Sequence, residues 1–318
     1  MALYTVTGGA GFIGSHLVEA LLGRGQEVRV FDDFSTGKPE NLEPVIGRIE
    51  VIEGDLRRLE DVRRALDGAD YVLHQAALSS VPRSVDDPLS TNAVNVGGTL
   101  NVLQAALDAG VKRVVNASSS SVYGDLDDFP LREEAGTDPM SPYAVSKLAG
   151  EKYCKVFTRL HGLETVSLRY FNVFGPRMDP MSDYAAFVAI FTTGLLEGRP
   201  LTVYGDGSIS RDWTYVDNVV DANLRAATAE GASGEAFNVA CGACWSLNEV
   251  IDVLRDLTRV DGDIRYGPVR PGDVAKTLAS TEKAERLLGY EPAVAAREGL
   301  ERTVTWYREL GRNGRRKA

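Results

Sequence analysis

The feature that most constrains this chain is a glycine-rich turn within its first fourteen residues. A short apolar strand over residues 3–6 runs into Gly8, Gly11 and Gly14, and an apolar stripe of helical period follows. Gly8 can take the positive φ of a tight turn, Gly11 lets the backbone approach a pyrophosphate, and Gly14 lets the helix pack against the strand. The amides and positive dipole end of that helix then face the phosphates. The turn therefore predicts a dinucleotide site, with a purely structural helix cap as the alternative.

Two acids follow the second expected strand, residues 27–31. Asp32 and Asp33 stand where a dinucleotide fold places an acid on the adenosine ribose. A carboxylate there accepts the ribose hydroxyls and repels a 2′-phosphate, which favours NAD over NADP; a pair of solvated loop acids is the alternative. Asp55, just past the third expected strand, is placed to accept the adenine amino group. For Asp55 the alternative is the N-cap of the next helix.

Length and composition predict one large core with a smaller appended lobe. The chain has 318 residues and a formal charge of −10, which argues against a nucleic-acid or anionic-membrane surface. Cys241 and Cys244 have redox or zinc spacing but lack a second ligand pair, so packing is their expected role. No apolar stretch reaches membrane-spanning length, and the N-terminus enters a strand without a charged leader. We expect a cytoplasmic protein without a metal.

Apolar strands and amphipathic helices alternate from residue 3 to residue 172. The expected strands cover residues 3–6, 27–31, 48–53, 71–74, 113–117 and 165–170, and the helices between them include 59–66 and 91–109. Such alternation predicts an α/β fold with a parallel, doubly wound sheet, whose ligands bind beyond the carboxyl ends of the strands. Gln75, Ala76 and Ala77 follow one such end and suit a backbone that lies against a cofactor.

After residue 172 the pattern becomes irregular, and short strands and helices alternate with turns. A strand over residues 235–239 is expected to return to the main sheet. No repeat and no low-complexity linker separates the two parts. We therefore predict a nucleotide-binding domain over residues 1–172, completed by that return strand, and an interwoven α/β substrate-binding lobe over residues 173–318.

An acid/base set follows the fifth expected strand. Tyr143 and Lys147 are four residues apart at the start of a helix expected to reach about residue 160, so they share one face. The ammonium can then lie near the phenol and lower a pKa that starts at about 10. A hydroxyl from the serine run at residues 118–121, at a neighbouring strand end, completes the set.

Taken together, these motifs resemble the extended short-chain dehydrogenase/reductase family over essentially the whole chain, and within it the UDP-hexose 4-epimerases. The likeness is carried by the glycine turn at 7–14 and by Gly54-Asp-Leu56, residues 74–78, Asn95-Val-Gly-Gly-Thr99, residues 119–124, Tyr143 with Lys147, and residues 169–175. The resemblance implies Ser119 as the catalytic hydroxyl, Tyr143 as the base and Lys147 as its partner. The phenolate would take the proton from a sugar hydroxyl, the carbon would give hydride to NAD⁺, and the keto sugar would receive it back on its other face.

The resemblance implies NAD as the cofactor and a UDP-sugar as the substrate. Cofactor contacts are expected from Gly8, Gly11, Phe12, Ile13, Gly14, Asp32, Asp33, Asp55, Leu56, Gln75, Ala76, Ala77, Asn95, Tyr143, Lys147 and Tyr170. Substrate contacts are expected from Ser80, Ser119, Ser121, Asn172, Tyr204, Arg211, Arg270, Asp273 and Thr277. Arg211 and Arg270 are assigned to the diphosphate because guanidinium forks match phosphate oxygens. Surface ion pairing is the alternative for both arginines.

Other activities on the same scaffold stay open at this point. Related dehydratases and decarboxylases resemble this chain but carry acids between the catalytic hydroxyl and the Tyr-Gly pair, where this chain has Ser120, Ser121 and Val122. Keto-sugar reductases share the scaffold too. A non-catalytic NAD-binding regulator would usually lose the Tyr143 and Lys147 pair, which this chain retains.

The substrate favoured by the resemblance is UDP-N-acetylglucosamine with UDP-N-acetylgalactosamine, and UDP-glucose with UDP-galactose should be slower. In the epimerases that this chain resembles, one residue bounds the pocket for the C2 substituent, and the resemblance places Thr277 there, which would leave room that a tyrosine would fill. Residues 75–84 and 175–180 also look like the subgroup that acts on N-acetylhexosamines. A plain hexose or a uronic acid is the alternative sugar.

A homodimer is the expected assembly. The helices over 91–109 and 143–160 flank one sheet face and could pair as a four-helix bundle. The patch would consist of Leu100, Leu103, Leu107, Val156 and Phe157. The alternative is that these residues bury against the sheet of their own chain.

Overall fold

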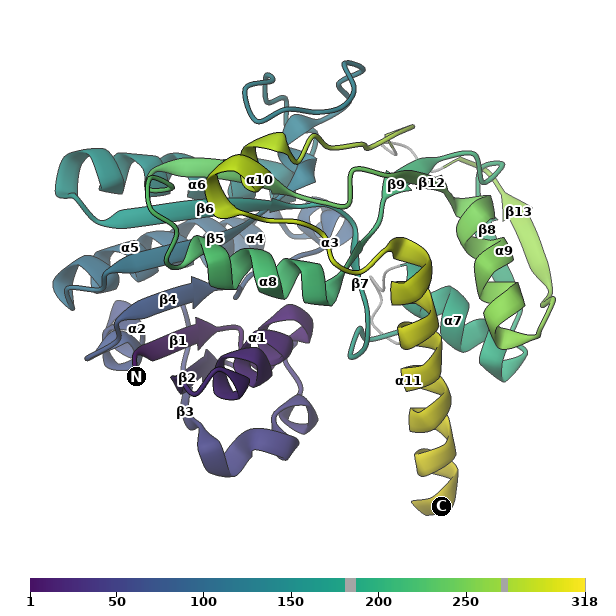
Figure 1. Ribbon diagram of the computed structural model, residues 1–318, viewed down its shortest axis with the longest axis horizontal. Coiled ribbons are helices and arrows are strands. Elements are labelled where there is room, and N and C mark those ends of the chain that lie inside the picture. The colour runs from purple at the N-terminus through teal and green to yellow at the C-terminus, as the bar shows by residue number, and fades with distance from the viewer. Residues whose placement is uncertain (181–186, 270–273, 318) are drawn as a thin grey trace.

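The computed structural model describes residues 1–180, 187–269 and 274–317, with side chains to residue 312. Its centre is a seven-stranded parallel sheet in the order β11-β6-β5-β4-β1-β2-β3 (Figure 1). The strands are β1 (Leu3–Thr7), β2 (Glu27–Asp32), β3 (Glu50–Glu53), β4 (Tyr71–His74), β5 (Arg113–Ser119), β6 (Glu164–Tyr170) and β11 (Glu235–Val239). The predicted doubly wound α/β fold is confirmed, and β11 returns to pair with β6.

Helices cover both faces of this sheet, as right-handed crossovers between parallel strands require. α1 (Phe12–Gly23) and α8 (Val216–Ala226) share one apolar core with β1, and Figure 1 shows these two helices on the same side of the sheet. α2 (Leu59–Leu66), α5 (Gly98–Asp108) and α6 (Pro142–His161) bury their apolar stripes in a second core. Alternate residues of each strand point into the two cores, which is why the strands read as continuous apolar runs.

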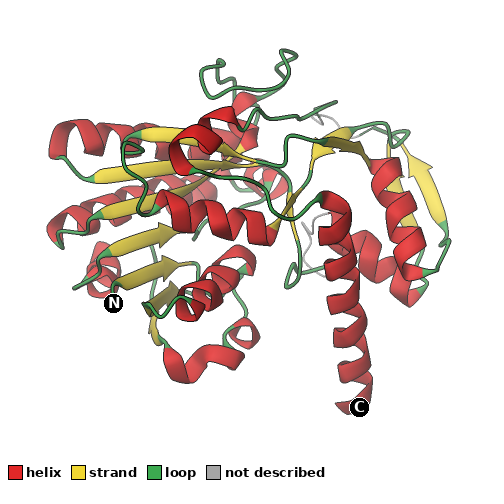
Figure 2. Ribbon diagram, in the orientation of Figure 1, coloured by secondary structure: helices red, strands yellow, loops and turns green. Residues whose placement is uncertain are grey.

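The second part of the chain consists of short strand pairs packed against helices. β7 (Val173–Phe174) pairs with β10 (Thr214–Tyr215), β8 (Leu201–Tyr204) with β13 (Ile264–Gly267), and β9 (Ser210–Asp212) with β12 (Cys244–Ser246). They form a separate core with α7 (Phe187–Glu197), α9 (Leu247–Thr258) and α11 (Ala296–Lys317), at the right of Figure 2. α10 (Glu282–Leu288) instead contributes to the core of the main sheet. The chain therefore passes between the two parts repeatedly, and the domain boundary after residue 172 stays a prediction.

One predicted helix differs in extent and in winding. The expectation over residues 91–109 corresponds to α4 (Pro88–Asn92), a π-helical turn η3 (Ala93–Gly97) and α5 in an unbroken run. The start lies earlier because the fixed φ of Pro88 suits a first helical turn and Asp87 caps it, accepting from the backbone N–H of Ser90 at 3.0 Å. A π turn adds one residue to the winding, which apolar spacing does not register.

Several short elements line the loops. α3 (Val81–Asp86) has Ser80 as its N-cap, and the Ser80 Oγ accepts from the Arg83 N–H at 3.2 Å. Tight 3₁₀ turns form at η1 (Pro39–Asn41), η2 (Glu43–Arg48) and η4 (Ser120–Tyr123). In the described ranges, no helix is both long enough and apolar enough to cross a lipid bilayer.

The three cysteines are free thiols. Cys154 lies on the buried side of α6, and burial raises the pKa of its thiol to about 12. Cys241 and Cys244 are partly buried, and their sulfur atoms contact Asn218 Nδ2 and the Thr277 carbonyl, each at 3.5 Å. Both thiols thus pack within the lobe, in keeping with the expected role.

Candidate functional site

The glycine turn joins β1 to α1 as predicted. Gly8 has a φ of +69°, and a Cβ there would lie 2.7 Å from the backbone nitrogen of Ala76. A Cβ on Gly14 would lie 2.0 Å from the Gly8 carbonyl oxygen. Gly11 precedes α1, all of whose residues are described, and this helix has neither a side-chain cap nor an acid in its first turn. The first N–H groups of α1, from Phe12 on, thus present an uncompensated positive end that fits a pyrophosphate.

Asp32 closes this turn from the end of β2. Its side chain is 7% exposed, and its carboxylate accepts the N–H groups of Ala10 and Phe34, both at 2.9 Å. Burial raises the pKa of Asp32, and these amides oppose the shift. Asp33 is exposed, and its Oδ1 accepts from the N–H and hydroxyl of Ser35. Both acids lie beside the glycine turn, where the ribose is expected, and their contact with it stays a prediction.

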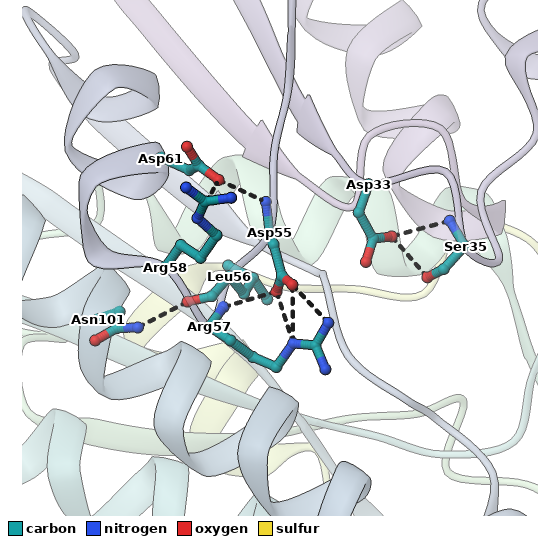
Figure 3. A network of polar contacts seen from close by, with 8 residues as sticks. All are labelled: Asp33, Ser35, Asp55, Leu56, Arg57, Arg58, Asp61 and Asn101. Carbon is teal, nitrogen blue, oxygen red and sulfur yellow. Dashed lines mark hydrogen bonds and ion pairs between the residues drawn. The ribbon is translucent and has the colours of Figure 1, made fainter.

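Asp55 lies in the loop after β3, across from Asp33 (Figure 3). Its Oδ2 accepts from Arg57 Nε at 2.9 Å and Nη2 at 2.6 Å, and the guanidinium lowers the pKa of Asp55. The alternative role as a helix N-cap is wrong, because the N-cap of the fully described α2 is Arg58, with no side-chain cap. The adjacent Leu56 is buried and its carbonyl accepts from Asn101 Nδ2 at 2.8 Å. These contacts hold the loop in place, and the contact of Asp55 with an adenine stays a prediction.

Buried polar contacts fix the end of β4. The ring nitrogens of His74 lie 2.7 and 3.0 Å from two threonine hydroxyls, and burial lowers its pKa to about 3, so the ring is neutral at neutral pH. Gln75 Nε2 donates to Asn223 Oδ1 at 3.1 Å, and the hydroxyl of Tyr170 accepts from Asn223 Nδ2 at 2.8 Å. These contacts tie β4 to β6 and α8. Burial raises the pKa of the Tyr170 phenol, which keeps it protonated.

Asn95, on the π turn, makes its polar contacts within the chain. Its Oδ1 accepts from the Leu78 N–H at 2.8 Å, and its Nδ2 donates to the Leu78 carbonyl and to Ser146 Oγ, each at 3.0 Å. Ser146 Oγ in turn donates to the Tyr143 carbonyl at 2.7 Å. Asn95 thereby fixes the segment after β4 against α6, and its direct contact with a cofactor stays a prediction.

The serine run and α6 bring a hydroxyl, a phenol and an ammonium together. Ser119, the last residue of β5, accepts from the N–H of Ser121 at 3.2 Å and from its hydroxyl at 3.0 Å. The Ser119 side chain is hydrogen-bonded to Tyr143, which lowers the phenol pKa. Lys147 Nζ donates to the Ala117 carbonyl at 2.8 Å and lies 6.0 Å from the centre of the Tyr143 ring. The set that the spacing predicts is therefore assembled.

The expected lowering of the Tyr143 pKa by Lys147 is wrong for this chain alone. Burial raises the pKa of Tyr143, and the hydrogen bond from Ser119 opposes the shift without cancelling it. Burial also lowers the pKa of Lys147 to about 8. The physical reason is that desolvation disfavours the charged form of each group, and the ammonium is bound to a carbonyl oxygen rather than to the phenol.

A cavity of about 250 Å³ lies in the lobe and is lined by predicted substrate residues. Its polar lining residues are Asn172, just after β6, Tyr204, at the end of β8, and Arg211 of β9. Apolar side chains such as Phe187 and Trp213 form the remaining wall. An apolar wall with a few convergent polar groups is typical of a small-molecule site. The guanidinium of Arg211 is the cationic group among these lining residues, and its assignment to a diphosphate stays a prediction.

Thr277 lies against the same wall. Its Oγ1 accepts from Asn172 Nδ2 at 3.1 Å and from the backbone N–H of Asp212 at 3.4 Å. Asn172 itself has a φ of +33°, an uncommon conformation that this contact helps to hold. Arg270 and Asp273 lie outside the described residues, so their assignment stays a prediction.

A buried ion pair beside Ser118 was not predicted. Glu151, one turn after Lys147 on α6, binds Arg169 of β6 through contacts of 2.9 and 2.8 Å, and both side chains are only 5% exposed. Ser118 Oγ donates to Glu151 at 2.6 Å, and the Arg169 guanidinium lies 4.7 Å from the centre of the Tyr123 ring. The signal available in the sequence is a charge inside an apolar strand, at Arg169, which burial permits only with a partner.

Comparison with family models matches residues 4–240 to the NAD dependent epimerase/dehydratase family. A UDP-glucose 4-epimerase of Mycolicibacterium smegmatis is 39% identical over 311 residues, 95% of this chain and 97% of that protein. A solved UDP-N-acetylglucosamine 4-epimerase from Methanobrevibacter ruminantium, in complex with UDP-N-acetylmuramic acid, is 38% identical with a TM-score of 0.92, over 97% of this chain and 99% of that one. A dTDP-glucose 4,6-dehydratase of Streptomyces griseus is 35% identical over 95% of this chain and 93% of that protein.

Proposed function

Because this chain belongs to the NAD-dependent epimerase/dehydratase family, we propose that it is a UDP-sugar 4-epimerase that inverts C4 of a UDP-hexose through a 4-keto sugar. Its cofactor is NAD, which the cradle of the glycine turn fits. The observation that carries the proposal is the proximity of the acid/base set to the cavity lined by Asn172, Tyr204 and Arg211. Ser119 pairs in the sheet with Tyr170, two residues before the cavity residue Asn172.

The residues divide the chemistry among them. Ser119 accepts both hydrogens that Ser121 offers, so its own hydrogen is directed to Tyr143 or to the sugar oxygen. Tyr143 takes the proton of the C4 hydroxyl and returns it after the keto sugar has turned over. Lys147, held by the Ala117 carbonyl, keeps a positive charge beside the reacting oxygen. When bound, NAD supplies the hydride acceptor at C4 and the hydride donor to the opposite face.

Dehydration and decarboxylation are disfavoured by the residues between Ser119 and Tyr123. Elimination of water across C5 and C6 needs an additional acid and base at this strand end. The chain has Ser120, Ser121 and Val122 there, and the hydroxyl of Ser121 is engaged with Ser119. The chain therefore shares the fold of the dehydratases, and its residues between Ser119 and Tyr123 do not supply the acid and base that dehydration needs.

The sugar we propose is an N-acetylhexosamine, with plain hexoses turned over more slowly. The support comes from Thr277, whose small side chain is drawn to the cavity wall by Asn172 and Asp212. A tyrosine at this position would extend into the space that we assign to the C2 substituent. UDP-glucose, UDP-galactose and UDP-uronic acids are the competing substrates.

A panel of UDP-sugars tests both the proposed reaction and the proposed sugar. Purified enzyme should interconvert UDP-N-acetylglucosamine and UDP-N-acetylgalactosamine, followed by the anomeric signals in NMR spectra, and should do so faster than the plain pair. Turnover of UDP-galactose without turnover of UDP-N-acetylgalactosamine would overturn the sugar assignment and leave the reaction standing. Loss of water from every substrate tried would overturn the reaction itself.

Thr277→Tyr should close the pocket selectively. We expect kcat/KM for the acetylated pair to fall by roughly 10- to 100-fold and that for UDP-glucose to change by no more than about 3-fold, because pocket size discriminates on this scale. Thr305→Tyr, at an exposed position on α11, is the matched control and should change neither. Equal losses for both sugar classes in Thr277→Tyr would contradict the assignment of this wall.

We propose a homodimer, though through a different surface from that first expected. Leu103 and Phe157 are buried in the chain's own core, and Leu100 and Leu107 pack against it, so these four residues of the expected patch are unsuitable. The outward side of α6 is apolar instead, beside α3 and α4. Its exposed members, which we call the α6 patch, are Val85, Leu89, Val145, Val156 and Leu160, with exposed fractions of 44–83%. We infer that these exposed apolar residues pair with their own copy about a two-fold axis.

Charge introduced into the α6 patch should separate the two copies. Light scattering of the wild-type protein should give about twice the chain mass of 34.4 kDa, and the Leu89→Glu/Leu160→Glu variant should give one chain mass. Ile46→Glu changes an exposed apolar residue on η2 and should stay dimeric. A wild-type mass of one chain at micromolar concentration would reject the dimer.

A further inference from the structure

Asp212 is a carboxylate buried behind the wall of the substrate cavity. It ends β9, directly after the cavity residue Arg211, and its side chain is fully buried. Within the described parts of the chain it takes part in no ion pair. Its carboxylate instead accepts three backbone N–H groups, from Cys241 at 2.8 Å, Gly242 at 3.0 Å and Ala279 at 3.3 Å. Burying an acid in this way costs free energy that the surrounding contacts must offset.

The three amides come from two segments, which also touch where Cys244 Sγ lies 3.5 Å from the Thr277 carbonyl. Cys241 and Gly242 form the turn before β12, and Ala279 belongs to the segment that carries Thr277. The backbone of Asp212 reaches the cavity wall on its other side. Its carbonyl accepts from Asn172 Nδ2 at 3.2 Å, and its N–H donates to Thr277 Oγ1 at 3.4 Å.

Only a carboxylate suits this junction. An ionised acid is an acceptor with about four lone-pair sites, so it can satisfy three converging N–H donors. An asparagine of the same shape would have to present its NH₂ group to at least one of them, because its single oxygen accepts fewer donors. The charge is thus kept because the geometry demands acceptors, although burial raises the pKa of Asp212 to about 6.

We propose that Asp212 is a positioning residue for the UDP-sugar, which it never touches, and that its carboxylate holds the Thr277 segment against β9 so that Asn172, Arg211 and Thr277 form one wall. This inference rests on the proposed function. It assigns substrate recognition to a side chain outside the cavity, whereas the acid/base set at the end of β5 lies beyond its reach. Loss of the carboxylate should therefore weaken substrate binding more than it slows the chemistry.

The first test is Asp212→Asn in the NAD-loaded enzyme. We expect KM for the UDP-sugar to rise by about 10-fold, because one buried amide loses its acceptor, while kcat stays within about 3-fold and bound NAD is unchanged. The preference between acetylated and plain sugars should narrow as Thr277 loses its anchor. Asp87→Asn is the control, because this acid also accepts a backbone N–H, that of Ser90, at an exposed helix cap and is not among the residues that line the cavity. Unchanged KM with unchanged sugar preference would overturn the proposal.

A second measurement needs no change at Asp212 and covers the case in which that variant fails to fold. Affinity for a UDP-sugar is measured between about pH 8 and pH 5 with the NAD-loaded Tyr143→Phe variant, in which turnover should be slowed by about 10²-fold or more. Only the ionised acid accepts all three amides, so affinity should fall by about 10-fold at pH 5, with the decline beginning near the Asp212 pKa of about 6. An affinity that stays constant over this range would overturn the proposal.

The neighbouring groups that Asp212 acts on do not titrate between pH 5 and pH 8. Its charge acts on the thiol of Cys241 and the phenol of Tyr290, and burial raises the pKa of Cys241 to about 12 and that of Tyr290 well above its ordinary value. Arg211, next along β9, stays protonated throughout. If the wild-type enzyme turned over no UDP-sugar, the proposed function would fail first, and this outcome is distinct from a positioning role that fails in an active enzyme.

Discussion

Replacing Tyr143 with phenylalanine should lower turnover by about 10²-fold or more, because the variant loses the general base and keeps everything else. The ring keeps its packing at the start of α6, and the hydrogen bond lost is the one to Ser119. The fold, the bound NAD and the KM for the UDP-sugar should therefore stay close to the wild type. The measurement is kcat for interconversion of the UDP-sugar pair at saturating substrate.

Tyr153→Phe provides the matched control on the same helix. Tyr153 is 37% exposed and lies ten residues after Tyr143, almost three helical turns farther along α6. Its removal should leave kcat within about 2-fold. Near-normal turnover in Tyr143→Phe would remove this residue from the mechanism, and equal losses in both variants would point to damage of α6 rather than of the base.

The main sheet and its nucleotide edge were predictable because each depends on local sequence. The strand, the three glycines and the following helix occupy a few consecutive residues, and only glycine fits where a Cβ at residue 14 would lie 2.0 Å from a carbonyl oxygen. The pairing of Tyr143 and Lys147 is likewise a matter of helical spacing. Such features need no knowledge of what lies across the molecule.

The protonation of the catalytic pair was not predictable from spacing. Four residues on a helix place Lys147 near Tyr143, but the side chain bends to the Ala117 carbonyl, which β5 supplies from elsewhere in the chain. Burial then decides the direction of the shift, so the pKa of the Tyr143 phenol is raised rather than lowered. The motif identifies Tyr143 and Lys147, but their pKa values depend on the residues that surround them in the fold.

The dimer surface was misassigned for a related reason. α6 carries apolar residues on two sides, and periodicity identifies both without saying which side meets the sheet. Phe157 faces the core, whereas Val156, the residue before it, is exposed. Asp212 was missed because its three partners come from residues 241, 242 and 279, which only the folded lobe brings together.

Arg169→Met should lower the free energy of unfolding by about 3–5 kcal/mol, the largest stability effect expected in this chain. Methionine fills a similar volume but leaves the buried carboxylate of Glu151 without its cation. The hydroxyl of Ser118 would remain as a hydrogen-bond donor to Glu151 and would compensate only in part. Denaturant unfolding followed by circular dichroism measures the change, read from the midpoint at constant slope.

Two further variants distinguish the cost of leaving a buried charge unpaired from the cost of losing an ion pair in general. Arg132→Met breaks a surface pair, in which the side chains of Arg132 and Glu282 are 54% and 68% exposed, and should cost at most about 1 kcal/mol. Adding Glu151→Gln to Arg169→Met removes the stranded charge and should restore part of the stability, because a neutral amide is less costly to bury. If the double variant were less stable than Arg169→Met alone, the penalty would arise from lost packing around Tyr123 rather than from the unpaired carboxylate.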